Sequence, residues 1–153
     1  MPKPRANPIL QTNAWALVPL ALATAAVIAP YCFTHGLLYP AFALQHGFAL
    51  VCHQRPDRCF WVFGAPVAVC ARCLGIYLGA AAGLVMRTSR AVAIRLLLIA
   101  AALNLVDVVT EYAGLHGNWM IARFGLGMML GVAGALLIAA SSHCGLQRDA
   151  IQY

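Results

Sequence analysis

Residues that can bind a metal or exchange thiols gather in one part of the chain, residues 51–77. This segment holds one histidine, His53, and four cysteines, Cys52, Cys59, Cys70 and Cys73. Cys70 and Cys73 are three residues apart at the start of an apolar run, so on a helix their side chains project to one side about one turn apart. This spacing suits two ligands of one metal ion or a redox-active thiol pair.

Acidic and basic side chains interrupt the apolar runs farther along the chain. Asn104, Asp107 and Glu111 follow one another at three and four residues and form one polar stripe on a helix. Carboxylates in a membrane span are costly and normally face a partner inside the bundle, and Arg123 is the expected partner of Asp107. The pair either fixes the packing of two helices or anchors an anionic substrate or headgroup. Tyr77, one turn after Cys73, is expected to line the same site as the cysteines.

The composition says which kind of fold must position these residues. The 153 residues are 63% hydrophobic and 9% charged, and the mean hydropathy is +0.81. Such a chain is an integral membrane protein with the lipid bilayer as its solvent, and its length suits one domain, residues 1–153. The net charge of +6 does not indicate nucleic-acid binding, because the basic residues flank apolar runs instead of gathering on one face.

The apolar runs predict an all-α bundle of four transmembrane helices, at about 14–33, 70–86, 92–112 and 119–141. The first run is longer than the apolar core of a signal peptide, so we interpret it as a retained span. Residues 36–51 are apolar but short and contain Pro40, Gln45, His46 and Gly47, which favours a re-entrant or interfacial segment. A cysteine-rich loop, residues 52–69, follows it.

Glycines at four-residue spacing mark two of the predicted helices. Gly75, Gly79 and Gly83 share one helix face, and Gly127 and Gly131 share another. Small residues at this spacing allow close helix approach, either within the bundle or between copies in a homo-oligomer.

The charges suggest an orientation in the cell membrane. With four spans and cytoplasmic N- and C-termini, the cysteine-rich loop lies on the outer side, and six basic residues lie inside: Lys3, Arg5, Arg87, Arg90, Arg95 and Arg148. Four lie outside: Arg55, Arg58, Arg72 and Arg123. If residues 36–51 span the membrane, the loop moves to the cytoplasmic side. With four spans, the cysteines, Asp107 and Arg123 share one membrane face.

Two sequence blocks resemble a known family. The blocks CHQRPDR (52–58) and CARCLGIYLG (70–79), with an Asp on the third predicted helix and an Asn-to-Arg element (Asn118 to Arg123) before the Gly-rich part of the last helix, are similar to the membrane proteins grouped as domain of unknown function 2085. The resemblance runs from about Val51 to Gly131 and implies a membrane protein without an established activity. Its implied shared residues are Cys52, His53, Gln54, Pro56, Arg58, Cys70, Arg72, Cys73, Gly75, Tyr77, Asp107 and Arg123.

This chain departs from the family pattern at two places. Cys59 stands where the family favours serine, which argues against a mechanism that needs Cys59. Near the end of the third predicted helix, Val108 follows Asp107 where the family tends to have glycine, and Glu111 stands where it tends to have glutamine. With Cys59 set aside, the expected metal ligands are Cys52, His53, Cys70 and Cys73, a set that zinc or another thiolate-preferring transition metal such as Cu(I) would accept.

Three functions stay open at this point. The first is the metal site beside the Asp107–Arg123 pair, with a lipid or small molecule as ligand and with Asp107, Arg123, Arg72 and Tyr77 as candidate catalytic residues. The second is a quinone-linked thiol–disulfide oxidoreductase, whose Cys70 and Cys73 react as thiolates at a helix N-terminus near Arg72. The third is a structural or interaction protein with inert disulfides.

Overall fold

The computed structural model describes residues 8–115 and 117–149, with side chains described for 14–115 and 117–141. The helices are α1 (Pro8–Thr34), α2 (Leu38–Ala49), α3 (Ala71–Val85), α4 (Arg90–Tyr112) and α5 (Met120–Asp149). The loop between α2 and α3 contains a 3-10 turn, η1 (Pro56–Arg58), and two short strands, β1 (Trp61–Val62) and β2 (Ala65–Pro66). Lys3, Arg5, both chain ends and the side chain of Arg148 lie outside the described residues.

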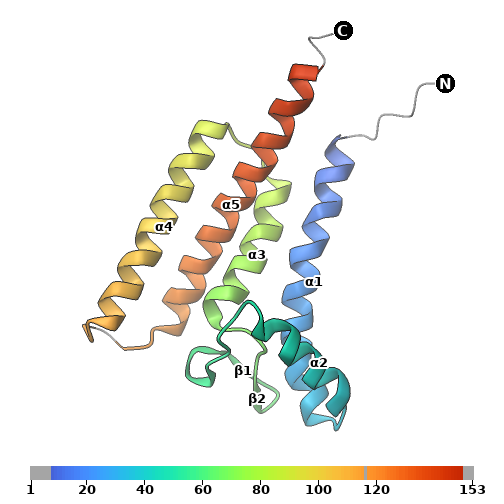
Figure 1. Ribbon diagram of the computed structural model, residues 1–153, viewed down its shortest axis with the longest axis vertical. Coiled ribbons are helices and arrows are strands. Elements are labelled where there is room, and N and C mark those ends of the chain that lie inside the picture. The colour runs from blue at the N-terminus through green and yellow to red at the C-terminus, as the bar shows by residue number, and fades with distance from the viewer. Residues whose placement is uncertain (1–7, 116, 150–153) are drawn as a thin grey trace, which may run out of the picture.

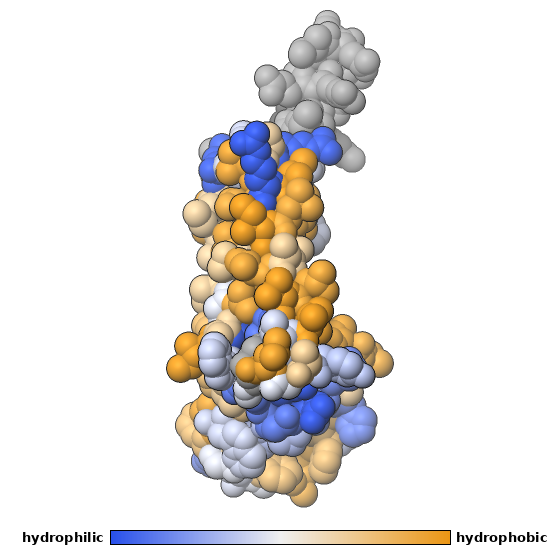
Figure 2. Space-filling view, turned by 90° about the vertical axis from the view of Figure 1, so that its left-hand side faces the viewer, coloured by the Kyte–Doolittle hydropathy of each residue, from blue (hydrophilic) through white to orange (hydrophobic). Residues whose placement is uncertain are grey.

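Three helices in the described part of the chain are long and apolar enough to cross a membrane: Ala14–Thr34 of α1, Arg90–Tyr112 of α4 and Met120–Ser141 of α5. Figure 2 shows an apolar band between two more hydrophilic zones on the α4 side of the molecule. The predicted span at 70–86 forms a shorter helix, α3, of 15 residues. At 1.5 Å per residue it rises about 22 Å, less than the roughly 30 Å of a hydrocarbon core, so the count of four spans stays a prediction.

The segment predicted to be interfacial or re-entrant contains a regular helix, α2, of 12 residues. It lies at the end of the molecule where β1, β2 and the α4–α5 connection also lie, and the α3–α4 connection lies at the opposite end (Figure 1). Its length of about 18 Å is too short to cross a bilayer. The position of α2 relative to the membrane surface stays a prediction.

Helices α3 and α5 contact each other backbone to backbone, which is one of the two arrangements that the glycine spacing left open. A Cβ atom at Gly83 would lie 2.6 Å from the carbonyl oxygen of Val132, and one at Gly79 would overlap the carbonyl group of Met128. The glycines of α5 are equally close, because Gly127 meets Arg72 and Gly131 meets Ile76. The glycine faces therefore pack against each other within one chain, which fixes α3 tightly against α5.

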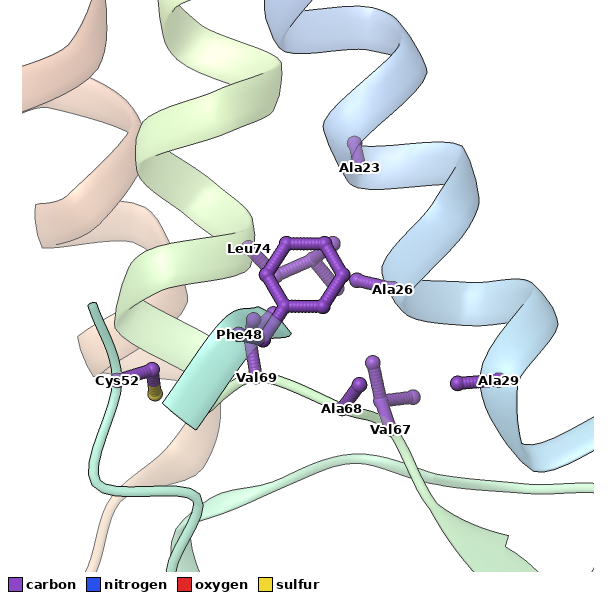
Figure 3. Close-up of a cluster of buried hydrophobic side chains, with 9 residues drawn as sticks. All are labelled: Ala23, Ala26, Ala29, Phe48, Cys52, Val67, Ala68, Val69 and Leu74. Carbon is purple, nitrogen blue, oxygen red and sulfur yellow. The ribbon is translucent and has the colours of Figure 1, made fainter. Parts of the chain in front are cut away.

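Helix α1 holds the other side of α3 through the segment that leads into it. Pro30 has no N–H group, so the carbonyl of Ala26, four residues earlier, has no helical donor. The backbone N–H of Ala68 donates to this carbonyl at 3.2 Å. Figure 3 shows the buried cluster around this point, with Phe48 of α2 among alanines of α1 and residues that precede or open α3: Ala23, Ala26, Ala29, Val67, Ala68, Val69 and Leu74.

Two glycines with positive φ set the turns that border the candidate site. Phe63 (φ 54°) and Gly64 (φ 79°) form the two-residue connection of the β1–β2 hairpin, in which Val62 pairs with Ala65. Gly114 (φ 71°) ends α4, where the N–H of Leu115 donates to the carbonyl of Thr110 and that of Gly114 to Glu111. Both turns lie at the end of the molecule where α3 begins (Figure 1).

Candidate metal centre

Three cysteines come together at the start of α3. The sulfur atoms of Cys52, Cys70 and Cys73 all lie within 4.8 Å of one another. Cys70 is the N-cap residue of α3 and Cys73 lies in its first turn, so the helix itself sets these two side chains next to each other. Cys52, shortly after the end of α2, accepts a hydrogen bond at its sulfur from the backbone N–H of Cys70, at 3.2 Å. The group is therefore built from two segments of the chain that are 18 residues apart.

Gln54 holds the Cys52 segment against the residues that precede α3. Its side-chain amide donates to the carbonyl of Gln45 on α2, at 2.6 Å, and to the carbonyl of Ala68, at 2.8 Å. Gln54 itself has a left-handed backbone conformation (φ 48°), an uncommon state for a residue other than glycine. Both polar backbone groups of the buried Ala68 thus have partners, and these bonds place Cys52 beside α3.

His53 and Cys59 lie outside the group of three thiols. The side chain of His53 is exposed, whereas that of the adjacent Cys52 is buried. Cys59 is buried with 1% exposure, and its thiol donates to the carbonyl of Arg55 at 3.1 Å. Three of the four predicted ligands are therefore together, and the role of His53 as the fourth stays a prediction.

The thiols of Cys52 and Cys59, both in the loop between α2 and α3, differ in their electrostatic surroundings. Hydrogen bonds from the thiols of Cys70 and Cys73 stabilise the thiolate of Cys52, and the backbone N–H of Cys70 adds a smaller contribution. Together they lower the pKa of Cys52 well below the ordinary value, although burial acts in the opposite direction. Burial and the nearby Cys52 and Cys70 raise the pKa of Cys59 to about 12. Cys59 is consequently a neutral thiol at physiological pH, which suits its serine-like hydrogen bond.

A network of ion pairs lies next to the thiols and joins α3, α4, α5 and the loop. Asp107 pairs with Arg72 of α3 and, at 3.7 Å, with Arg123 of α5. Glu111 pairs with Arg123 and, at 2.9 Å, with Arg58 of η1. The side chains of Asp107 and Arg123 are only 9% and 4% exposed. The predicted pairing of Asp107 with Arg123 is present, and it belongs to a larger network than the sequence indicated.

The network holds the loop as well as the helices. Arg58 belongs to η1, and the side-chain amide of Asn118, in the α4–α5 connection, donates to the backbone carbonyl of Asp57. Arg72, which Asp107 holds, stands between Cys70 and Cys73 in the sequence. Asp57 extends the network, because it pairs with both Arg58 and Arg55. Among the described residues, four guanidinium groups then face three carboxylates, so the network carries one net positive charge beside the thiols.

Tyr77 lies one helical turn after Cys73, on the side of α3 that faces α1 and α2. Its ring centroid is 6.2 Å from that of Phe48, and its side chain is partly buried. It therefore lies at the border between Cys73 and the space between α1 and α2, which it lines. Its role in the site stays a prediction.

The family of the chain can now be stated from comparison with known proteins. The model of the family described as "Predicted membrane protein (DUF2085)" matches residues 52–137, which include every candidate ligand and the whole ion-pair network. The chain belongs to this family. The family match begins at Cys52, so α1 and α2 lie outside it.

The relatives of this family member have no described activity. An uncharacterized protein of Methanocaldococcus jannaschii is 51% identical over 39 residues, which cover 26% of this chain and 25% of that protein. An uncharacterized protein of Methanothermobacter thermautotrophicus is 32% identical over 101 residues, which cover 63% of this chain and 91% of that protein. This chain thus spans about a quarter of the first relative and most of the second. No solved structure matches it.

Sequence reasoning missed two parts of the site. It named Arg123 as the partner of Asp107 but did not pair Arg72 with Asp107 or Arg58 with Glu111. The adjacency of Arg72 to both cysteines was a usable signal, because a residue between Cys70 and Cys73 must stay near the site. The pairing of Arg58 depends on the path of the loop, which follows no local pattern of residues.

Proposed function

We propose that this membrane protein binds a divalent transition metal, zinc by preference, through Cys52, Cys70 and Cys73. The observation that carries the proposal is the convergence of three sulfur atoms within 4.8 Å. Sulfur atoms that bind one tetrahedral zinc ion at about 2.3 Å lie less than about 4 Å apart, so a small contraction of this group would bring all three sulfur atoms to bonding distance of one ion. Three protein ligands leave the fourth position to a water molecule, a substrate or His53.

The charge of the surroundings favours a divalent ion over Cu(I). A divalent ion with three thiolates carries one negative charge, and the adjacent ion-pair network carries one positive charge. Cu(I) with the same three thiolates would carry two negative charges and leave one of them without compensation. Because an uncompensated charge is costly at a partly buried site, the network matches the zinc-type complex better.

The open position decides what the metal can do. Structural zinc sites are closed by four protein ligands, whereas catalytic sites keep one position for water or substrate. In this protein the metal would act as a Lewis acid on a bound lipid or small molecule. Arg72 and Arg123 would compensate the negative charge of the thiolates, and Asp107 would hold these two guanidinium groups in place. Tyr77 would border the substrate.

The experiment is metal analysis of detergent-purified protein combined with a thiol count under denaturing conditions. We expect about one equivalent of zinc per chain with free thiols, and loss of the metal in Cys70→Ser and Cys73→Ser. Cys59→Ser is the matched control, because a serine hydroxyl can keep the hydrogen bond to Arg55 and this residue lies outside the group. Metal retained in Cys70→Ser, or absent from the parent protein, would contradict the proposal.

His53→Ala separates the two forms of the site. If water or substrate fills the fourth position, this variant keeps its metal, and its affinity for zinc equals that of the parent protein. If the exposed His53 turns toward the thiols when metal binds, the affinity falls by an order of magnitude or more, and the closed four-ligand site replaces the open one in the proposal.

The same thiol triad supports a second candidate, a quinone-linked thiol–disulfide oxidoreductase. The observation that favours it is that Cys52 lies with the Cys70–Cys73 pair, while Cys59 is held apart. Two thiols would form a disulfide and release two electrons and two protons, which reduce a quinone to a quinol. Metal-free protein in which the Cys70–Cys73 pair is oxidised by added quinone would establish this function in place of the first, and inert disulfides would leave a structural role.

A further inference from the structure

A hollow opens between α1, α2 and α3 on the side of the thiol site away from the ion-pair network. Its volume is about 380 Å³, within the range of small-molecule sites. All its lining residues are apolar except for the hydroxyl of Tyr77: Leu22, Ala25, Ala43, Leu44, Gly47, Phe48, Val51 and Tyr77. Its shape comes from small residues, since a Cβ atom at Gly47 would meet no other atom within 4 Å.

The hollow ends next to the proposed metal ligands. Val51, one of its lining residues, directly precedes Cys52, and Tyr77 lies one helical turn beyond Cys73. The ring of Tyr77 packs against Phe48, and both side chains also contact the core around Cys52. A molecule in the hollow therefore has one end beside the three thiols.

The other side of the hollow is continuous with the apolar outer surface. Leu22 and Val51 line the hollow and are 40% and 65% exposed. Because α1 contains one of the candidate spans, hydrocarbon chains of the bilayer surround this surface. An empty apolar hollow that opens to such chains is filled by them, since a void forfeits dispersion contacts.

We infer that the hollow binds the hydrocarbon chain of a membrane lipid and so presents an amphiphilic, lipid-derived substrate to the Cys52–Cys70–Cys73 site. The chain-binding part of this inference is independent of the metal. The substrate class rests on the proposed function. The almost wholly apolar lining selects the chain and not the headgroup, so the polar end of the lipid is free to lie at the thiols.

The test uses the full-length protein in vesicles of phosphatidylcholine that contain a small fraction of the same lipid with a photoactivatable diazirine in one acyl chain. After illumination, mass spectrometry locates the cross-linked residues. We expect cross-links at the lining residues of α2 and at Tyr77. Gly47→Leu fills the hollow and should reduce these cross-links at least about tenfold. Gly134→Leu is the matched control, because a Cβ atom at Gly134 of α5 would also meet no other atom within 4 Å.

The outcomes separate this inference from the metal proposal. Cross-links at α2 and Tyr77 that are lost in Gly47→Leu and kept in Gly134→Leu support the inference, whether or not metal is present. Cross-links confined to the outward faces of α4 and α5, or unchanged in Gly47→Leu, overturn it. Ala43→Leu serves as a second filling variant, so that misfolding of Gly47→Leu, seen as aggregation in size-exclusion chromatography, leaves the test decisive. The metal content of each variant is measured in parallel and decides the proposed function separately.

Discussion

The two sides of α3 are built in opposite ways. Toward α5, glycines bring the two backbones into direct contact, and no side chain of either helix fits between them at Gly79 or Gly131. Toward α1 and α2, side chains such as Tyr77 and Phe48 keep the helices apart and leave the 380 Å³ hollow. Helix α3 is thus fixed from one side and accessible from the other, and the thiols at its N-terminus lie where the two sides meet.

Residues on the tight side of α3 position the thiols, and residues on the open side give a ligand access to them. The contact with α5 and the ion pairs at its end hold Arg72, and with it Cys70 and Cys73, in one place. A site that must present three thiols to one ion needs such a rigid support. The opposite side needs room for a ligand, and its small residues supply that room. The two sides should therefore respond differently to the same kinds of substitution.

The largest effect should come from breaking the ion pairs on the tight side. Asp107→Ala leaves Arg123 with Glu111 as its one carboxylate partner among the described residues, and it removes the carboxylate that Arg72 contacts. Removing one partner of a buried pair costs about 3–5 kcal/mol, because a buried charge is left uncompensated. We expect a lower midpoint of thermal unfolding in detergent and a lower metal content.

Asp57→Ala is the control for this substitution. Asp57 also pairs with two arginines, Arg55 and Arg58, but its side chain is 54% exposed. Exposed pairs contribute about 0–1 kcal/mol, so this variant should unfold within a few degrees of the parent protein. Equal destabilisation by the two substitutions would show that burial of the Asp107 network does not support α3.

A smaller loss should follow from adding one methyl group between α3 and α5. At Gly79→Ala the new Cβ overlaps the carbonyl group of Met128, which is backbone and cannot turn away. Overpacking of this kind costs about 1–3 kcal/mol, more than the higher helix propensity of alanine returns. The measurement is thermal unfolding in detergent, with Gly134→Ala as the control because its Cβ would meet no neighbour. If Gly79→Ala unfolds at the same temperature as Gly134→Ala and the parent protein, the close contact between α3 and α5 is refuted.

Local rules predicted part of this arrangement from the sequence. Two glycine faces suited to close helix approach followed because residues four apart share one helix face, although their pairing with each other did not. The proximity of Cys70 and Cys73 followed from the same periodicity. The approach of Asp107 and Arg123 followed from the short connection between their helices. These predictions required no information beyond helix periodicity and the length of one short connection.

Other features depended on the path of the loop, which has no period. The hydrogen bond from Ala68 to Ala26 exists because Pro30 cannot donate, and nothing in the sequence identifies which distant N–H replaces it. Gln54 and its left-handed backbone likewise place Cys52 by contacts made only in the folded chain. The length of α3 was overestimated because Cys70 and Met86 are apolar enough to extend the pattern, although they cap the helix and do not belong to it.

The smallest effect should have the opposite sign and should appear on the open side. Gly47 lies inside α2, its φ is not positive, and a Cβ atom there would enter the hollow without touching another atom. Gly47→Ala should therefore stabilise the protein by about 0.5–1 kcal/mol, because alanine loses less backbone entropy in a helix and adds apolar contact. Thermal unfolding measured beside Gly79→Ala compares one substitution at two sites that differ only in the space around them. If both variants lose stability, the hollow between α1, α2 and α3 is filled by protein, and the contrast between the two sides of α3 does not exist.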